Sequence, residues 1–157
     1  MSSPLVLFLD ASILVTAAGS PSGGSSAVLQ ILARSSVVGA VSMPVLDEAR
    51  RNVLKKLRPE AGIRLMMLLR VTPMALVSVP LDAPHRYPMI NAKDAHVYAA
   101  AEASGATILL TLDRGLIAEV NRLQFGPRAI TPGDFLTTVV PNLPVHHSNG
   151  NGNGHMR

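Results

Sequence analysis

Two short apolar runs, each followed by an aspartate, limit the folds open to this chain more than any other feature. Residues 5–9 are all apolar and precede Asp10, and residues 107–112 are mostly apolar and precede Asp113. Runs of this length are typical of strands buried on both faces, which occur mainly in parallel sheets covered by helices. Ligands of open α/β sheets bind beyond the carboxyl ends of the strands. Both aspartates are therefore expected at a functional site.

Strand-like and helix-like segments alternate along the rest of the chain. Further strands are predicted at 37–41, 75–79 and 128–130, and helices at 12–18, 26–34, 42–57, 59–70, 92–104, 115–122 and from about 131 onward. The proline-rich segment 81–90 is expected to be an irregular connection. This alternation predicts an α/β fold with three layers, α/β/α, around a central, mostly parallel sheet.

Composition indicates one compact domain with a tail. Residues 1–144 are expected to form the domain, and 145–157, mainly Asn, Gly and His, to form a disordered tail without a core. Hydrophobic residues make up 48% and charged residues 15%, which favours a well-buried core and suits a homodimer. No apolar run reaches the roughly 18 residues that cross a bilayer. Without cysteine there is no disulfide or zinc-thiolate site, so a cytoplasmic location is expected.

Acidic residues are the main candidates for catalysis. Besides Asp10 and Asp113, Asp94 lies near a predicted helix start, and Asp47 and Glu48 are neighbours on another helix. Carboxylates placed close together repel, so such a site usually implies a cation. Carboxylate oxygens prefer hard cations such as Mg²⁺ and Mn²⁺. These ions activate water and stabilise a phosphodiester during displacement, so the acids predict metal-dependent phosphodiester hydrolysis.

Each acid also has a structural alternative. Asp10 could cap the helix that follows it, and Asp94 occupies the acidic position of a turn similar to a capping box. Asp113 could be a turn residue or a member of a surface ion pair. The apolar stripe of the 42–57 helix lies slightly nearer to Asp47 than to Glu48, so helix geometry does not choose between these two acids.

Hydroxyl and basic residues accompany the acids. Ser12 follows Asp10 by two positions and Thr111 precedes Asp113 by two, so either hydroxyl could orient a carboxylate or a bound water. The segment around Glu48 is rich in basic residues, which suits a polyanionic substrate or forms an ordinary exposed helix face. The candidates for contact with substrate phosphates are Arg50, Arg51, Lys93 and Arg114.

Two other classes of phosphate chemistry fit the sequence poorly. Gly19 and Gly24 have the spacing of a nucleotide-binding loop, but the lysine that such a loop requires is absent. Aspartyl phosphatases need a second aspartate two residues after the first, and Ser12 occupies that position. Aromatic residues make up only 3% of the chain, which argues against a base-stacking platform.

Four segments in order resemble a PIN-domain protein. They are LFLDASILV (7–15), SMPVLDEARR (42–51), KDAHVYAAA (93–101) and TLDR (111–114), and TPGDFL (131–136) is similar to the end of many such domains. The resemblance covers about residues 5–138. It implies a parallel sheet flanked by helices and Mg²⁺- or Mn²⁺-dependent ribonuclease activity. In many members that activity belongs to the toxin of a VapC-like toxin–antitoxin pair.

The resemblance also implies roles for individual residues. The acidic site would consist of Asp10, Glu48, Asp94 and Asp113, with Glu48 chosen over Asp47 on this basis alone. Three of these acids, all but Glu48, would bind the metal, and Thr111 would be a supporting hydroxyl. The expected function is endoribonuclease cleavage of RNA by a metal-activated water, with a cognate antitoxin as partner. The alternative is a non-catalytic PIN-like module that binds RNA or protein.

Overall fold

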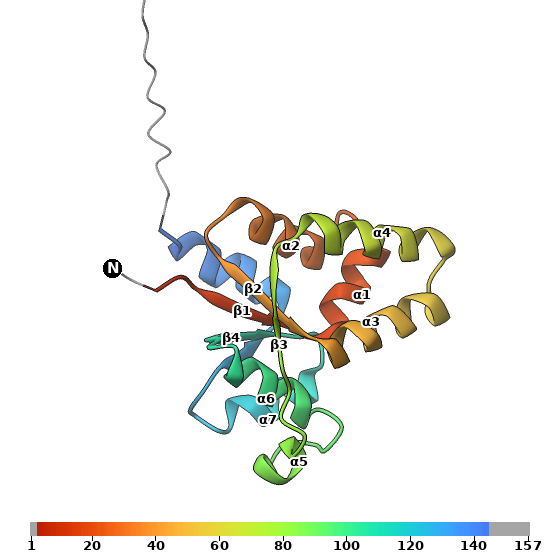
Figure 1. The fold of residues 1–157 in the computed structure, drawn as a ribbon. Coiled ribbons are helices and arrows are strands. Elements are labelled where there is room, and N and C mark those ends of the chain that lie inside the picture. Colours follow the sequence, from red (N-terminus) through yellow and green to blue (C-terminus); the bar gives the residue numbers. More distant parts are fainter. Residues whose placement is uncertain (1–2, 145–157) are drawn as a thin grey trace, which may run out of the picture.

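A computed structural model describes residues 3–144, which form a parallel five-stranded sheet with helices on both faces (Figure 1). The strands are β1 (Val6–Leu9), β2 (Val38–Ser42), β3 (Met74–Val77), β4 (Ile108–Leu110) and β5 (Arg128–Ile130). Every strand pair among them is parallel. The predicted three-layer α/β/α fold is confirmed. The predicted tail lies outside the described residues.

The strand order places β1 at the centre of the sheet. The order is β3-β2-β1-β4-β5, and Leu7 of β1 pairs with Gly39 on one side and Ile108 on the other. The chain therefore builds the sheet outward to β3 and then returns to add β4 on the opposite side of β1. Open α/β sheets form their ligand crevice where the strand order reverses, at the carboxyl ends of the strands. Here that point lies between β1 and β4.

The helices divide between the two faces of the sheet. One face carries α1 (Ala11–Gly19), α2 (Gly24–Arg34), α3 (Met43–Lys56) and α4 (Pro59–Val71), whereas α5 (Ala83–Arg86), α6 (Ala95–Ala103) and α7 (Arg114–Asn121) cover the other (Figure 1). The chain continues through α8 (Pro132–Asp134), which contacts α2, into one π-helical turn (Phe135–Val139) and one 3-10 turn (Val140–Asn142). Right-handed crossovers explain this division, because the direction of strand addition changes after β3.

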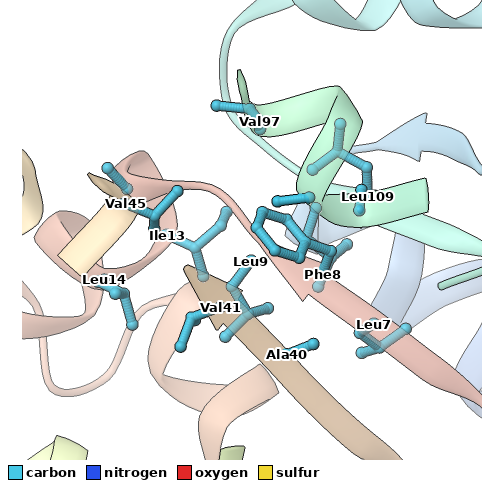
Figure 2. Close-up of a cluster of buried hydrophobic side chains, with 14 of the residues drawn as sticks. Leu7, Phe8, Leu9, Ile13, Leu14, Ala40, Val41, Val45, Val97 and Leu109 are labelled. Carbon is cyan, nitrogen blue, oxygen red and sulfur yellow. The ribbon is translucent and has the colours of Figure 1, made fainter. Parts of the chain in front are cut away.

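The core lies around the central strand. Phe8 and Leu9 of β1 are completely buried, as are Leu109 of β4 and Ile13 and Val45 of the covering helices (Figure 2). A strand that is buried on both faces needs an unbroken apolar run rather than alternation. The run before Asp10 satisfies this requirement, which is why it was recognisable in the sequence.

Two predicted element boundaries were wrong. Segment 81–90, expected to be irregular, contains the short helix α5. The helix predicted from residue 92 begins only at Ala95, with Asp94 at its N-cap position. Asn91 instead accepts a hydrogen bond from the amide of Lys93 at 3.2 Å, within a turn that precedes the helix.

Helix α4 exposes two methionines whose apolar character alone would favour the core. Met66 and Met67 are 67% and 61% exposed, because α4 contacts the rest of the fold through Ala61 and Leu65 instead. None of the helices in the described part of the chain is long and apolar enough to cross a membrane.

The buried central strand predicts a large stability cost on truncation. Leu9→Ala is expected to lower the free energy of unfolding by about 2–5 kcal/mol, since it removes a fully buried side chain and leaves a cavity. Leu81→Ala is the matched control, because Leu81 is fully exposed and its truncation should change stability by less than about 0.5 kcal/mol. Urea unfolding followed by circular dichroism measures both values, and equal effects would contradict the assignment of Leu9 to the core.

Candidate functional site

The four predicted acids line one pocket. The pocket has a volume of about 270 Å³, and its lining includes Asp10, Glu48, Asp94, Asp113 and Lys93. Asp10 follows β1 and Asp113 lies just beyond β4, so the pocket is at the point where the strand order reverses. Residues more than 100 positions apart in the chain are thereby brought together. Their assignment as catalytic residues stays a prediction.

Asp10 is the most buried of these acids and accepts three hydrogen bonds. The amide of Ala11 donates to Oδ1 at 2.8 Å, so Asp10 does cap α1. The hydroxyls of Thr111 and Ser12 donate to Oδ2 at 2.7 and 3.2 Å. An ionised carboxylate offers about four lone-pair positions. With three of them used, the carboxylate of Asp10 has roughly one lone-pair position left, on Oδ1, for a further ligand.

The same two hydroxyls tie the ends of β1 and β4 together. Ser12 Oγ accepts a hydrogen bond from the amide of Leu112 at 3.1 Å, and Thr111 Oγ1 accepts one from the amide of Asp113 at 3.1 Å. Each hydroxyl thus acts as donor and acceptor at once. Thr111 is completely buried, so its bonds to Asp10 and Asp113 are shielded from water. Both hydroxyls thus contact the carboxylate of Asp10, and their supporting role in catalysis stays a prediction.

Burial sets the electrostatics of Asp10. Only 8% of the residue is exposed, and this desolvation raises the pKa of its carboxyl, while the hydrogen bonds from Thr111 and Ala11 partly oppose the increase. The nearby charge of Asp94 raises the pKa further. The ionised form of Asp10 is therefore destabilised in this fold, and a cation in the pocket would relieve that cost.

Asp94 and Asp113 share the cation of Lys93. Lys93 Nζ lies 3.1 Å from Asp94 Oδ2 and 3.8 Å from Asp113 Oδ2. The hydrogen bond to Asp94 raises the pKa of Lys93, and the charges of Asp113 and Glu48 act in the same direction. Asp94 makes no capping hydrogen bond despite its N-cap position. Asp113 does cap α7, accepting from the amide of Leu116 at 3.1 Å.

The structure separates Glu48 from its neighbour Asp47. Glu48 is half-buried and lines the acidic pocket, whereas Asp47 is exposed and lines a different groove, between α3 and α4. Successive helical residues point about 100° apart, so one side chain can face the pocket while the next faces away. Glu48 is therefore the one of the two that lies with the other acids, and its role as a site residue stays a prediction.

The predicted basic residues are less concentrated at the pocket than expected. Lys93 lines it, but Arg50 lines the α3–α4 groove with Asp47, and the exposed Arg51 and Arg114 are not part of its lining. Asn52 and Lys56 line the pocket instead, and the sequence prediction did not single them out for this site. A usable signal was present, because these residues follow Glu48 by four and eight positions on the same face of α3.

The donor chemistry of the pocket fits a hard divalent cation. Four carboxylates are available, and the ammonium of Lys93 already provides a positive charge between Asp94 and Asp113. Among residues 3–144, no three acidic or histidine side chains are grouped closely enough in this conformation to hold one ion. Binding an ion between these two acids would thus require Lys93 to move and the carboxylates to draw together.

Comparison with known proteins agrees with this architecture. A family model described as the PIN domain matches residues 7–123. The structure is similar to that of VapBC2 from Rickettsia felis bound to a DNA fragment from their promoter, with a TM-score of 0.61 and 20% identity over 81% of this chain and 98% of that one. It is also similar to PAE2754 from Pyrobaculum aerophilum, with a TM-score of 0.59 and 21% identity over 84% and 87% of the two chains. No curated protein matches the sequence significantly.

The raised pKa of Asp10 predicts that the metal-free wild type loses stability as pH rises, and that Asp10→Asn does not share this loss. Asparagine can cap a helix, but its amide nitrogen cannot accept the hydrogen bonds that Thr111 and Ser12 donate to Oδ2, which lowers the stability of the variant at every pH. Because the folded-state pKa of Asp10 is raised, wild-type stability falls as pH rises from the ordinary aspartate range through the folded pKa. The melting temperature of the variant minus that of the wild type should therefore increase with pH over this interval and then level off. Melting curves in EDTA at several pH values measure this difference, and a difference that stays constant or decreases with pH would contradict the inferred cost of burial.

Proposed function

Because this chain belongs to the PIN domain family, we propose that it is a metal-dependent endoribonuclease. The observation that carries this proposal is the convergence of Asp10, Glu48, Asp94 and Asp113 in one pocket at the reversal of strand order. Their acidic oxygens suit phosphodiester hydrolysis with Mg²⁺ or Mn²⁺. Basic side chains in the same pocket suit a polyanionic substrate such as RNA.

The residues of the pocket would have separate roles in the reaction. Ser12 and Thr111 would hold the carboxylate of Asp10 in one orientation, through the hydrogen bonds described above. Asp10, Asp94 and Asp113 would hold the metal ion, which when bound supplies activation of water and charge neutralisation at the phosphate. Glu48, on the α3 wall of the pocket, would hold the ion or orient a water. No covalent intermediate with the protein is needed.

Lys93 would change partners when a metal binds. In the structure its ammonium neutralises Asp94 and Asp113. If Asp94 and Asp113 held a divalent ion instead, the side chain of Lys93, which is 66% exposed, would be free to turn towards solvent. In that position it would attract a phosphate of the RNA. Lys56, which also lines the pocket, would contribute a second positive charge.

The proposal extends to a toxin role with an antitoxin partner. The VapC-like resemblance of the motifs suggests this role, with the cytoplasm as the place of action. Exposed apolar side chains on α3 and α4 support a protein partner, because Leu54, Ile63 and Met66 line a groove of about 530 Å³ and each is more than 60% exposed. Apolar surface of this kind is typical of protein interfaces, and it is also compatible with the expected homodimer.

One observation favours a second candidate function, a non-catalytic module that binds RNA or protein. Lys93 already satisfies two of the four acids, so the pocket is partly neutralised without a metal. If this were its only role, the protein would bind RNA with equal affinity in Mn²⁺ and in EDTA and would cleave none. A panel of RNAs incubated with each divalent ion distinguishes the two functions.

Cleavage by the wild-type protein should require both a divalent ion and Asp10. We expect RNA cleavage with Mg²⁺ or Mn²⁺, none with EDTA, and a reduction on the order of 100-fold or more in Asp10→Asn. Gel electrophoresis of a labelled RNA panel measures the rate. Circular dichroism of the variant serves as the control for folding, and full activity in a folded Asp10→Asn would contradict the assignment.

The neighbouring acids of α3 provide a matched pair of variants. Glu48→Gln should reduce cleavage strongly, because Glu48 lines the pocket, whereas Asp47→Asn should leave the rate nearly unchanged, because Asp47 lines the α3–α4 groove. Each substitution removes one negative charge, and the two positions are adjacent, so the net charge of the protein changes equally in both variants. The ratio of the two kcat/KM values decides the assignment, and equal reductions would show that neither side chain has a specific role.

A further inference from the structure

A second pocket, rich in basic residues, adjoins the acidic one. It has a volume of about 550 Å³ and lies where α1, α3 and α4 meet. Lys56, Arg58 and Arg64 line it, with Glu60 as the acidic side chain in its lining. We call it the basic pocket. Three cations against one anion give its wall a net positive charge.

Arg64 is fixed in place but lacks an acidic partner. Its Nε donates a hydrogen bond to the backbone oxygen of Ala18 at the end of α1, which sets the plane of the half-buried guanidinium. No acidic side chain in the described part of the chain forms an ion pair with Arg64, and Glu60 does not despite lying four residues before it. The two terminal nitrogens therefore keep their donors for a ligand. An oriented guanidinium of this kind matches the geometry of a phosphate.

Lys56 connects the basic pocket to the site of the proposed reaction. This single side chain lines both pockets. A ligand that extends from the acids towards Arg64 would therefore pass Lys56 on the way. To meet Lys56 and then Arg64, the ligand needs negative charges at intervals along its length. The backbone of a single-stranded nucleic acid carries such charges, one at every phosphate.

We propose that the basic pocket binds a second phosphate of the same RNA strand, outside the scissile position. The inference rests on the proposed ribonuclease function. It adds the path of the strand over the surface, which runs from the acidic pocket past Lys56 to Arg64. Contacts with phosphates position a strand without reading its bases. Arg64 is thus a positioning residue: it should lower the KM of longer RNAs, contribute little to kcat, and have no effect on substrates too short to reach it.

The test compares Arg64→Gln with a matched control on the same helix. Arg70 is exposed in the last turn of α4 and lines neither pocket, so Arg70→Gln removes the same charge elsewhere. Fluorescein-labelled oligouridylates, from a dinucleotide to about twelve nucleotides, are bound to the full-length protein in EDTA and followed by fluorescence anisotropy. For wild type, affinity should rise with length until the strand reaches the basic pocket.

Arg64→Gln should remove that rise in affinity. The slope of log K against log salt should become shallower by about 0.7, because the variant neutralises one RNA phosphate fewer than the wild type. Between about 200 and 50 mM salt, the advantage of the wild type on long RNAs should therefore grow roughly 2.5-fold. With dinucleotides the two proteins should bind alike, and Arg70→Gln should retain the length dependence of the wild type.

Other results would overturn the inference. Equal length dependence in wild type and Arg64→Gln would contradict the second phosphate site while leaving the ribonuclease proposal intact. If wild type bound no oligouridylate of any length, the second phosphate site would likewise be contradicted, whereas the ribonuclease proposal is decided by the cleavage assay with Mg²⁺ or Mn²⁺. Competition by an oligoglutamate peptide that Arg64→Gln abolishes, without any change in RNA binding, would assign the pocket to an acidic protein segment instead.

A second variant tests the same pocket in case Arg64→Gln does not fold. Arg64 supports the end of α1 through Ala18, so its replacement could unfold the protein. Arg58 also lines the basic pocket, but its side chain is exposed and is not used as a cap for α4. Arg58→Gln should therefore stay folded and show a reduced salt slope on long RNAs only. An unchanged slope in Arg58→Gln, together with an unfolded Arg64→Gln, would also contradict the proposal.

Discussion

The buried carboxylate of Asp10 is the interaction on which the centre of this structure depends. It caps α1, and through the hydroxyls of Ser12 and Thr111 it is joined to the loop that follows β4. Those hydroxyls accept in turn from the amides of Leu112 and Asp113. A buried charge is costly unless hydrogen bonds satisfy it, and three of them do so here. The network therefore holds two strand ends in register and keeps a destabilised carboxylate at the edge of the sheet.

Apart from Lys93, which pairs with Asp94 and Asp113, charges of opposite sign are largely separated around this centre. The acids lie inside the pocket with Lys93 among them, whereas Lys56, Arg58 and Arg64 extend the surface towards the junction of α1, α3 and α4. Acids that bind a cation and bases that bind phosphates must be close but not paired with one another, or each would neutralise the other. Arg64 meets this condition because a backbone oxygen, rather than a carboxylate, fixes its guanidinium. The same division suits a strand whose scissile phosphate reaches a metal while a neighbouring phosphate is held.

Several features were predictable because they depend on local pattern. Unbroken apolar runs indicated β1 and β4, and the helix predicted at 42–57 is α3, which begins at Met43 after its cap Ser42. The errors occurred where tertiary contacts decide. A helix was expected from residue 92, yet α6 starts after Asp94. Met66 and Met67 are apolar enough for the core, but α4 turns them outward because it contacts the fold through its other face, which carries Ala61 and Leu65.

The sequence by itself determined the parallel α/β architecture and the positions of Asp10 and Asp113 at strand ends, because burial on both faces requires continuous apolar runs and the polar residues must follow them. It could not determine which side chains meet. The tertiary structure decided that Glu48 and not Asp47 lines the acidic pocket, that Asp94 pairs with Lys93 rather than capping its helix, and that Lys56 joins two pockets. Such pairings depend on how helices rotate and pack against the sheet. That rotation is set by contacts between residues far apart in the chain, which no local pattern contains.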